Sequence, residues 1–222
     1  MYIKSSHLFL QTNGKLESSS IYTYAFNLPA VSTCPGAGIC REYCFASAEQ
    51  KRHPSAMAHR QQSLELSKSI EFIATITAEL SKLRNRHIVR NTDFAIRIHA
   101  SGDFYSMEYI RNWFRIMEAH PNIQFYAYTK SIALMKRIGY FPANFICIYS
   151  EGGNQDALID TQIDRHARIF GSEQLALDAG YTLANEDDAA AWQSTSNKIG
   201  LVIFGAIRKW GNISQIAIDS NK

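Results

Sequence analysis

Residues 94–130 read FAIRIHASGDFYSMEYIRNWFRIMEAHPNIQFYAYTK, and this stretch decides the fold class. Its two ends, residues 94–100 and 123–129, are rich in β-branched and aromatic residues, a composition typical of strands. Between them, Ser106 is a suitable N-cap for a helix whose apolar residues recur at helical spacing until His120 and Pro121 stop it. Strand, helix and strand at this spacing predict a βαβ unit with parallel strands.

The rest of the chain shows the same alternation. Further strands are expected at residues 21–28, 145–150, 168–170 and 198–205, and helices at residues 55–83, 132–138 and 172–179, with Ser55 as the N-cap of the longest. No repeat and no long linker divides the chain, so residues 1–222 are predicted to form a single α/β domain. The predicted architecture is a partial (β/α)6-type barrel with mainly parallel strands.

Composition indicates a globular protein with a substantial core. Of the 222 residues, 46% are hydrophobic and 19% are charged, which excludes a disordered, collagen-like or coiled-coil protein. No segment has the pattern of a signal peptide, and none approaches the roughly 18 continuous apolar residues of a membrane-spanning helix. We therefore expect a cytoplasmic protein in a reducing compartment, with no membrane partner.

Charge is unevenly distributed along the chain. Residues 1–90 carry 11 Lys and Arg against 6 Asp and Glu, a net charge of +5, whereas residues 91–222 carry 12 against 14, a net charge of −2. A basic N-terminal half, with Lys51, Arg52, Arg60 and the arginines of residues 84–90 as its centres, suits an anionic partner such as a nucleic acid or a nucleotide. The alternative is that these side chains lie on solvated helix faces.

Three of the four cysteines lie in one loop. Residues 33–46 read TCPGAGICREYCFA, with five residues between Cys34 and Cys40 and three between Cys40 and Cys44, directly after the first of the predicted strands. Zinc hooks usually have two to four residues between paired cysteines and a second pair downstream, which this chain lacks. Three thiolates on one loop suit an iron–sulfur cluster that leaves one iron open for another ligand.

Other metal ligands are less clearly defined. A histidine such as His53 or His59 would complete a zinc site with the three cysteines, and this alternative stays open. Cys147 stands among hydrophobic neighbours on a predicted strand, so we expect a buried core residue there, and the alternative is a fourth cluster ligand. The acidic run at residues 186–188 precedes an alanine-rich segment, and acidic residues are common in a first helical turn, so we do not predict a metal site there.

Polar side chains alternate along two of the predicted strands. Residues Arg97, His99, Ser101 and Asp103 are expected to share one face by their period of two. Crossover helices cover the outer face of a parallel sheet, so these side chains are predicted to line the inside of a barrel or a cleft. The same reasoning applies to the next strand, with Tyr126, Tyr128 and Lys130.

The carboxyl ends of the predicted strands carry most of the remaining candidates. Ligands of such folds bind at the carboxyl ends of parallel strands. The cysteine loop, Gly102–Asp103, Lys130–Ser131 and Ser150–Glu151 all follow directly after predicted strands. We therefore expect these four segments to lie together in space.

Three cysteines on the loop after the first strand, Tyr43 just before the last of them, and Gly102–Asp103 after the second strand resemble the radical S-adenosylmethionine superfamily. This resemblance implies a radical-SAM-like fold, with a [4Fe–4S] cluster on the three cysteines and S-adenosylmethionine on the open iron. It also implies that Asp103, with the backbone of Ser101 and Gly102, holds the methionine amino group. The cysteine spacing differs from the three-then-two spacing of most members.

The resemblance divides the remaining candidates into two groups. Tyr43, Ser150 and Glu151 are expected to bind the cofactor together with Ser101, Gly102 and Asp103. The expected catalytic residues are Arg97, His99, Tyr126, Tyr128 and Lys130.

The segments TCPGAGIC, YCFA, FAIRIHASGDFYS and FYAYTKS look more closely like the phage and plasmid proteins of the gene product 88 family. This likeness implies a metal-binding or iron–sulfur role in the cytoplasm of a bacterial host, without naming a substrate. The first functional hypothesis is a small radical S-adenosylmethionine-type enzyme. The alternatives are a regulatory or binding protein whose iron–sulfur or zinc centre contacts nucleic acid or a host protein, and a redox or sulfur-transfer protein.

Overall fold

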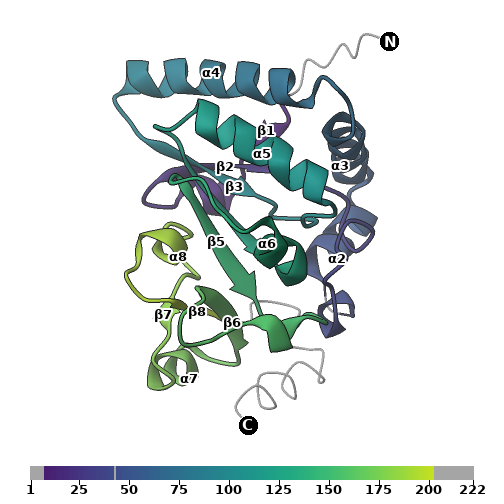
Figure 1. Cartoon of the computed structure of the whole chain (residues 1–222). Coiled ribbons are helices and arrows are strands. Elements are labelled where there is room, and N and C mark those ends of the chain that lie inside the picture. The colour runs from purple at the N-terminus through teal and green to yellow at the C-terminus, as the bar shows by residue number, and fades with distance from the viewer. Residues whose placement is uncertain (1–7, 43, 203–222) are drawn as a thin grey trace.

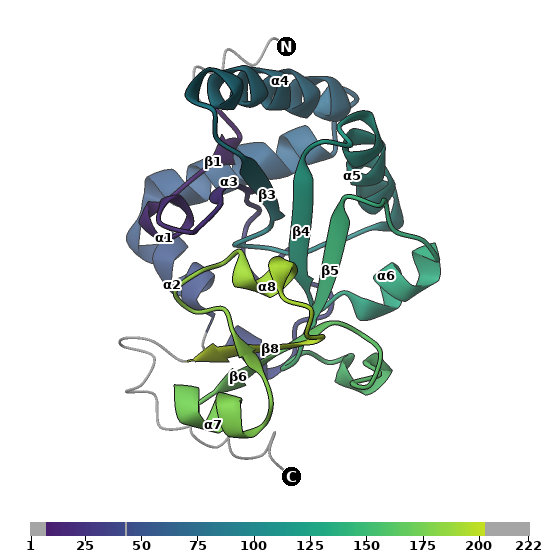
Figure 2. The same cartoon turned by 90° about the vertical axis from the view of Figure 1, so that its left-hand side faces the viewer.

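One mixed sheet organises the protein in the order β1-β2-β3-β4-β5-β6-β8-β7 (Figure 1 and Figure 2). The structure is a computed structural model that describes residues 8–42 and 44–202. Strand β1 is antiparallel to β2, and every other pair of neighbours is parallel. The strands are β1 (Leu10–Gln11), β2 (Tyr22–Phe26), β3 (Phe94–Ile98), β4 (Gln124–Thr129), β5 (Phe145–Ser150), β6 (His166–Phe170), β7 (Thr182–Leu183) and β8 (Lys198–Val202).

Helices cover the outer face of this sheet and bury the main core between themselves and the strands. Residues of α4, α5 and α6 pack there against β2 to β5, as Figure 1 shows. The helices are α1 (Gly14–Glu17), α2 (Phe45–Arg52), α3 (Pro54–Ser67), α4 (Phe72–Arg90), α5 (Met107–Ala119), α6 (Ile132–Ile138), α7 (Glu173–Asp178) and α8 (Ala190–Gln193), with 3-10 turns at Ile39–Arg41 and Asp156–Leu158. Within the described ranges, no helix is long and apolar enough to span a membrane.

The βαβ unit at residues 94–130 is confirmed. Helix α5 begins where predicted, because the Ser106 side chain accepts a hydrogen bond from the backbone N–H of Tyr109. Its apolar stripe, which includes Trp113 and Phe114, is fully buried against the sheet. Strands β3 and β4 pair in parallel on either side of this crossover.

The predicted single helix at residues 55–83 is wrong. Two helices occupy this stretch, because the chain turns between Ser67 and Phe72 and leaves Ile70 99% exposed. Helix α3 also begins earlier than predicted, with Pro54 in its first turn instead of Ser55 at its N-cap. Helix α2, which follows the cysteine loop, was not predicted. Predicted strand residues 203–205 lie outside the described residues.

The inner face of the sheet is covered by the segment around α8. Figure 2 shows α8 lying in front of the sheet, and its Ala191 and Trp192 pack with Tyr126 in a second hydrophobic cluster. Side-chain contacts also bridge the opening of the sheet: Ser19 Oγ donates to Asp187 Oδ1 (2.5 Å), and Lys15 Nζ donates to Asp188 Oδ1 (3.2 Å). The edge strands β1 and β7 do not pair with each other. The fold is therefore α/β with an open, mostly parallel sheet.

Candidate functional site

The cysteine loop is fastened to the carboxyl end of β3 where it leaves β2. The Leu28 N–H donates to the Ser101 carbonyl (2.8 Å), and the Ser101 hydroxyl donates back to the Leu28 carbonyl (2.8 Å). Gly102 has a φ of +84°, and a Cβ there would lie 2.5 Å from the Leu28 Cβ. A glycine is therefore required at the turn that meets the loop.

The loop then crosses the carboxyl ends of β4 and β5. A Cβ on Gly36 would lie 1.8 Å from the Lys130 carbonyl oxygen, so only glycine allows the two backbones to approach this closely. Beyond it, the Asn154 N–H donates to the Gly36 carbonyl (3.0 Å), and Ala37 forms a β-bridge with Gly153. The predicted gathering of these segments at one end of the sheet is confirmed.

The three loop thiols are half-buried and close enough to influence one another. Burial, together with the negative charge of Asp103, raises the pKa of Cys34 to about 12. Burial also raises the pKa of Cys40, although the positive charge of Lys130 partly offsets this effect. Cys44 is the N-cap of α2, and its Sγ accepts a hydrogen bond from the Ser47 N–H (3.4 Å). A helix N-terminus favours negative charge, so this position suits a thiolate ligand.

No three His, Cys, Asp or Glu side chains within residues 8–42 and 44–202 are grouped closely enough to hold a metal ion. Neither histidine of the zinc alternative forms such a group with the cysteines in the described ranges. His53 is exposed at the start of α3, and the Nε2 atom of His59 lies 3.2 Å from the Leu8 carbonyl oxygen. A ready-made single-ion site is therefore absent from the described residues.

Buried Arg60 holds α2, and with it the last loop cysteine, in place. Its Nη1 donates to the Ala46 carbonyl (3.0 Å) and to Gln50 Oε1 (3.4 Å), and its Nη2 pairs with Glu49. Gln50 Oε1 also accepts the Ala30 N–H (3.1 Å) at the start of the loop. Arg60 is thus a structural residue, and its predicted place on a basic surface is wrong.

Asp103 ties together the ends of β3 and β4. Its buried carboxylate accepts hydrogen bonds from Thr129 Oγ1 (2.6 Å), the Lys130 N–H (2.8 Å) and the Phe104 N–H (2.7 Å). Burial raises the pKa of Asp103, while these hydrogen bonds act in the opposite direction. Three of the roughly four acceptor positions of a carboxylate are therefore used inside the protein.

Lys130 ties the end of β4 to the end of β5. Its Nζ donates to the Ser150 hydroxyl (2.5 Å), the Ser150 carbonyl (3.2 Å) and the Glu151 carbonyl (2.8 Å), which uses all three ammonium donors. Glu151 Oε2 accepts a hydrogen bond from Arg168 Nε (2.7 Å), whereas Oε1 lies 3.8 Å from His166 Nε2. Lys130, Ser150 and Glu151 thus lie together, as predicted.

A charged network lies deeper on the inner face. Arg97 Nη1 donates to both oxygens of Asp188 (3.1 and 3.0 Å), and the Tyr126 hydroxyl donates to Asp188 Oδ2. Burial acts to raise the pKa of Asp188, but the charges of Arg97 and Lys15 outweigh it and hold this pKa below its ordinary value. The Arg97 guanidinium also lies 4.9 Å from the centre of the Tyr128 ring. Three of the predicted catalytic residues are therefore together.

Asp188 is a site residue that the sequence interpretation missed. Its carboxylate is buried, whereas the acidic run was predicted to occupy only the first turn of a helix. The run precedes the short helix α8, as predicted, but Asp188 pairs with Arg97 in the network. One feature of the sequence pointed to such a residue. Arg97 was predicted on a buried strand face without an acidic partner, and a buried arginine needs a counter-charge.

His99 lies on the opposite face from Arg97, so the prediction that they share a face is wrong. Its backbone φ is +74°, which interrupts the alternation of β3. The ring packs on Phe104, and Nε2 shares a hydrogen bond with the Tyr109 hydroxyl (2.8 Å) in the main core. Burial, and to a lesser degree the charge of Arg97, lowers the pKa of His99 to about 3, so the ring is neutral.

Two candidates remain, Cys147 and Tyr43. Cys147 is partly buried and packs against the main core. Tyr43 lies outside the described residues.

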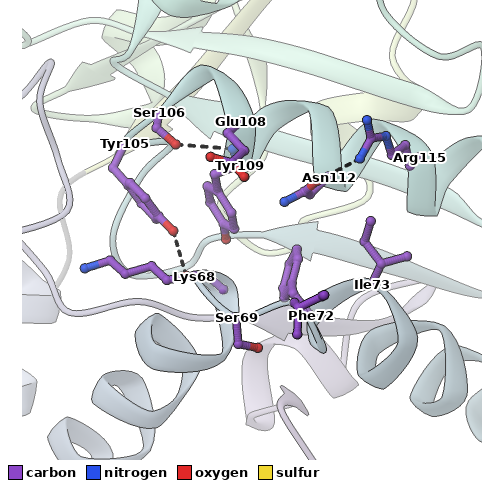
Figure 3. A pocket seen from close by; sticks show the side chains of 12 residues that line it. Lys68, Ser69, Phe72, Ile73, Tyr105, Ser106, Glu108, Tyr109, Asn112 and Arg115 are labelled. Atoms are coloured by element: carbon purple, nitrogen blue, oxygen red, sulfur yellow. Dashed lines mark hydrogen bonds between the residues drawn. The ribbon is translucent and has the colours of Figure 1, made fainter.

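Two hollows lie away from the cysteine loop. A groove of about 410 Å³ lies between the α3–α4 turn and the start of α5, and the Tyr105 and Tyr109 rings stack there with their centres 4.6 Å apart. Figure 3 shows the side chains that line it. A second hollow of about 510 Å³, lined by Arg84, His87 and Trp192 among others, opens near the amino ends of β3 and β4. The candidate site is thus defined by its side chains and not by these hollows.

The fold and the site together define an α/β protein whose cysteine loop is packed on the carboxyl ends of an open, mostly parallel sheet. The family model described as Gene product 88 matches residues 7–216, so the chain belongs to the Gene product 88 family.

Two similar proteins come from mycobacteriophages. The chain is 30% identical over 105 residues to the Gene 88 protein of Mycobacterium phage L5, a match that covers 44% of this chain and 43% of that protein. It is 29% identical over 104 residues to the Gene 88 protein of Mycobacterium phage D29, covering 44% of this chain and 42% of that protein. The matches thus span less than half of the length of these relatives. No solved structure matches the chain.

Proposed function

We propose that the chain is a radical S-adenosylmethionine-type iron–sulfur enzyme, acting in the cytoplasm of a bacterial host, with a [4Fe–4S] cluster on Cys34, Cys40 and Cys44. The observation that carries this proposal is the contact of Gly36 with the Lys130 backbone. This contact fixes a loop with three thiols across the carboxyl ends of parallel strands, where α/β folds bind their ligands.

Three thiols on one loop are a donor set that suits an iron–sulfur cluster. The three thiols influence one another electrostatically, yet they are not grouped as ligands of one ion. In a cluster each thiolate binds a different iron, so the sulfur atoms lie farther apart than around a single ion. Three protein ligands would leave one iron open for S-adenosylmethionine.

Cys34, Cys40 and Cys44 would hold the cluster, which would supply one-electron reductive cleavage of the sulfonium of S-adenosylmethionine, with the electron coming from an external reductant. The protein's part is to bind and to orient. Gly102 and Asp103 would hold the amino group. Ser101 is a positioning residue, because its N–H donates to Asn27 Oδ1 (3.0 Å) and its carbonyl accepts the Leu28 N–H. Lys130 would fix Ser150 and Glu151 beside the cofactor.

Anaerobic purification with iron and sulfide analysis tests the cluster. We expect about four irons per chain and a change in the spectrum of the reduced cluster when S-adenosylmethionine is added, followed by release of 5′-deoxyadenosine. Cys34→Ala should lose most of the iron. Cys147→Ala is the matched control, since Cys147 lies in the main core, and it should keep its iron. Stoichiometric zinc without iron would contradict the proposal.

A second candidate is a regulatory protein that uses the same centre and contacts nucleic acid. It is favoured by the exposed Arg84, Arg86 and Arg90 in the last two turns of α4. Such clusters bind phosphates with an affinity that falls as salt rises. This candidate would be favoured over the enzyme if iron-loaded protein shows no spectral change with S-adenosylmethionine and binds duplex DNA in a salt-dependent way.

A further inference from the structure

We propose that the inner face of the sheet binds a carboxylate or phosphate group of the substrate, at the Tyr128 hydroxyl between Arg97 and Arg165. The inference deepens the proposed function by naming the substrate as an anion. The binding of an anion is argued independently of the proposed function, and only the statement that this anion is the substrate rests on it.

The Tyr128 hydroxyl is the first observation. It is buried and has no hydrogen-bond partner among the described residues. Buried polar groups are nearly always paired with protein, water or ligand, so this hydroxyl calls for a partner. The ring itself is held in place by the Arg97 guanidinium, 4.9 Å from its centre, and by the Tyr126 ring at 6.5 Å.

The Arg97 guanidinium is the second observation. Its Nη1 is used by Asp188, and its Nε donates to the His99 carbonyl (3.4 Å). Within the described part of the chain, its Nη2 has no acceptor, and the side chain is 19% exposed. One edge of this planar, permanently charged group is therefore available, and arginine is well suited to bind carboxylate and phosphate.

Charge balance is the third observation. Arg165 donates to the Ala191 carbonyl (3.0 Å) and the Ser194 carbonyl (2.8 Å), but no carboxylate pairs with it among the residues described. Its positive charge lowers the pKa of Tyr128, although burial and the negative charge of Asp188 have larger effects and raise this pKa. Lys15 and Arg97 thus share one carboxylate, Asp188, while Arg165 is bonded only to carbonyl oxygens within the described residues. Arg165 is half-buried, and a partly buried charge without a counter-charge is unfavourable, so an anion bound beside it would offset this cost.

The unpaired groups also define the chemistry of the ligand. The Arg97 Nη2 is only a donor, and the Tyr128 hydroxyl can donate a proton to an acceptor. A group with several acceptor oxygens and a negative charge satisfies both, whereas a cation would be repelled. Tyr128 precedes Lys130 by two strand positions, roughly 7 Å, so a substrate anchored here can extend toward the cysteine loop.

A titration of the full-length chain, before any iron is added, tests this inference. Tyrosine rings are labelled with ¹³C, and the Tyr128 signal is assigned by its loss in Tyr128→Phe. Inorganic phosphate and acetate are added separately, with chloride holding the ionic strength constant. A saturable shift with phosphate supports a phosphate-bearing substrate, and one with acetate supports a carboxylate-bearing substrate. No saturable shift with either anion overturns the inference.

Variants locate the bound anion. Tyr128→Phe keeps the ring beneath Arg97 but removes the hydroxyl, so binding followed at the Tyr126 signal should weaken about tenfold. Arg165→Gln should weaken binding similarly and leaves the hydroxyl in place, which provides the same test if Tyr128→Phe does not fold. Tyr140→Phe, at an exposed position, should bind like the wild type. Unchanged binding in both Tyr128→Phe and Arg165→Gln would overturn the inference.

The two proposals fail separately. A chain that loads iron but binds neither anion contradicts only the anion site. A chain that binds an anion but loads no iron contradicts only the cluster.

Discussion

Arg97 and Asp188 lie 91 positions apart in the chain, yet Nη1 of the arginine is 3.0 Å from Oδ2 of the aspartate. The pair joins β3 to the segment that leads into α8, across the inner face of the open sheet. Lys15 reaches the same carboxylate from the N-terminal side. The edge strands β1 and β7 do not pair, and the buried Asp188 carboxylate instead connects segments from different parts of the open sheet.

The first prediction concerns this charge. Asp188→Asn keeps the shape of the side chain but leaves Arg97 without a counter-charge. We expect the free energy of unfolding to fall by about 3 kcal/mol, because removing one partner of a buried ion pair leaves the other charge buried and uncompensated. Urea unfolding at pH 7 measures the change.

Asp178→Asn is the matched control for Asp188→Asn. Asp178 is exposed at the end of α7, so its substitution should change the stability by less than about 0.5 kcal/mol. A loss in Asp188→Asn no larger than that of the control would show that the network does not stabilise the fold.

Much of the fold could be predicted because it depends on local signals. The Ser106 cap and the apolar stripe after it define α5, and the bounds of α6 and β5 match their predicted ranges. The gathering of Gly102, Lys130 and Glu151 also followed from the sequence, since the carboxyl ends of parallel strands meet at one edge.

The failures involve conformation or contacts that no local pattern records. His99 leaves the predicted face because its backbone adopts a positive φ, which alternation cannot show. Asp188 looked like a first-turn acid because its partner, Arg97, is distant in sequence. The turn at Ile70 interrupts a continuous helical pattern of apolar residues, and the exposure of Ile70 shows that helical spacing alone does not guarantee burial.

The second prediction is a pH dependence that originates at His99. Burial, with a smaller effect of Arg97, lowers its pKa in the folded state to about 3, whereas an unfolded histidine titrates near 6.5. Between these values the unfolded chain binds a proton that the folded chain does not. The contribution to stability is therefore complete above about pH 6.5 and falls by about 1.4 kcal/mol per unit as the pH decreases toward 3.

His99→Gln should remove this part of the slope when urea unfolding is compared between pH 7 and pH 4. His53→Gln is the control, because His53 is exposed before α3 and its substitution should leave the slope unchanged. Equal slopes in the wild type and His99→Gln would show that another group causes the acid sensitivity.

The third prediction concerns Lys130. Lys130→Met keeps most of the aliphatic chain but removes the donor to the Ser150 and Glu151 carbonyls. We expect a loss of about 2 kcal/mol in the free energy of unfolding, since partly buried carbonyls lose a charged donor. Lys136→Met, which breaks an exposed pair with Asp164 (2.7 Å), should cost less than about 1 kcal/mol. Urea unfolding of both variants gives the comparison, and equal losses would contradict the role assigned to Lys130.

The fourth prediction addresses the contact on which the proposed function depends. Gly36→Ala places a Cβ where the Lys130 carbonyl oxygen lies only 1.8 Å away, so the cysteine loop must move off the end of β4. We expect stability to fall by about 1–3 kcal/mol, iron loading to drop several-fold, and alkylation of the half-buried Cys34 and Cys40 to become several times faster. Gly14→Ala is the control, because a Cβ there has no atom within 4 Å, and it should behave like the wild type. The alkylation rate, followed by mass spectrometry of modified peptides, reports on the loop even without iron. Wild-type rates in Gly36→Ala would mean that the loop does not need this contact to hold its thiols at the carboxyl ends of the strands.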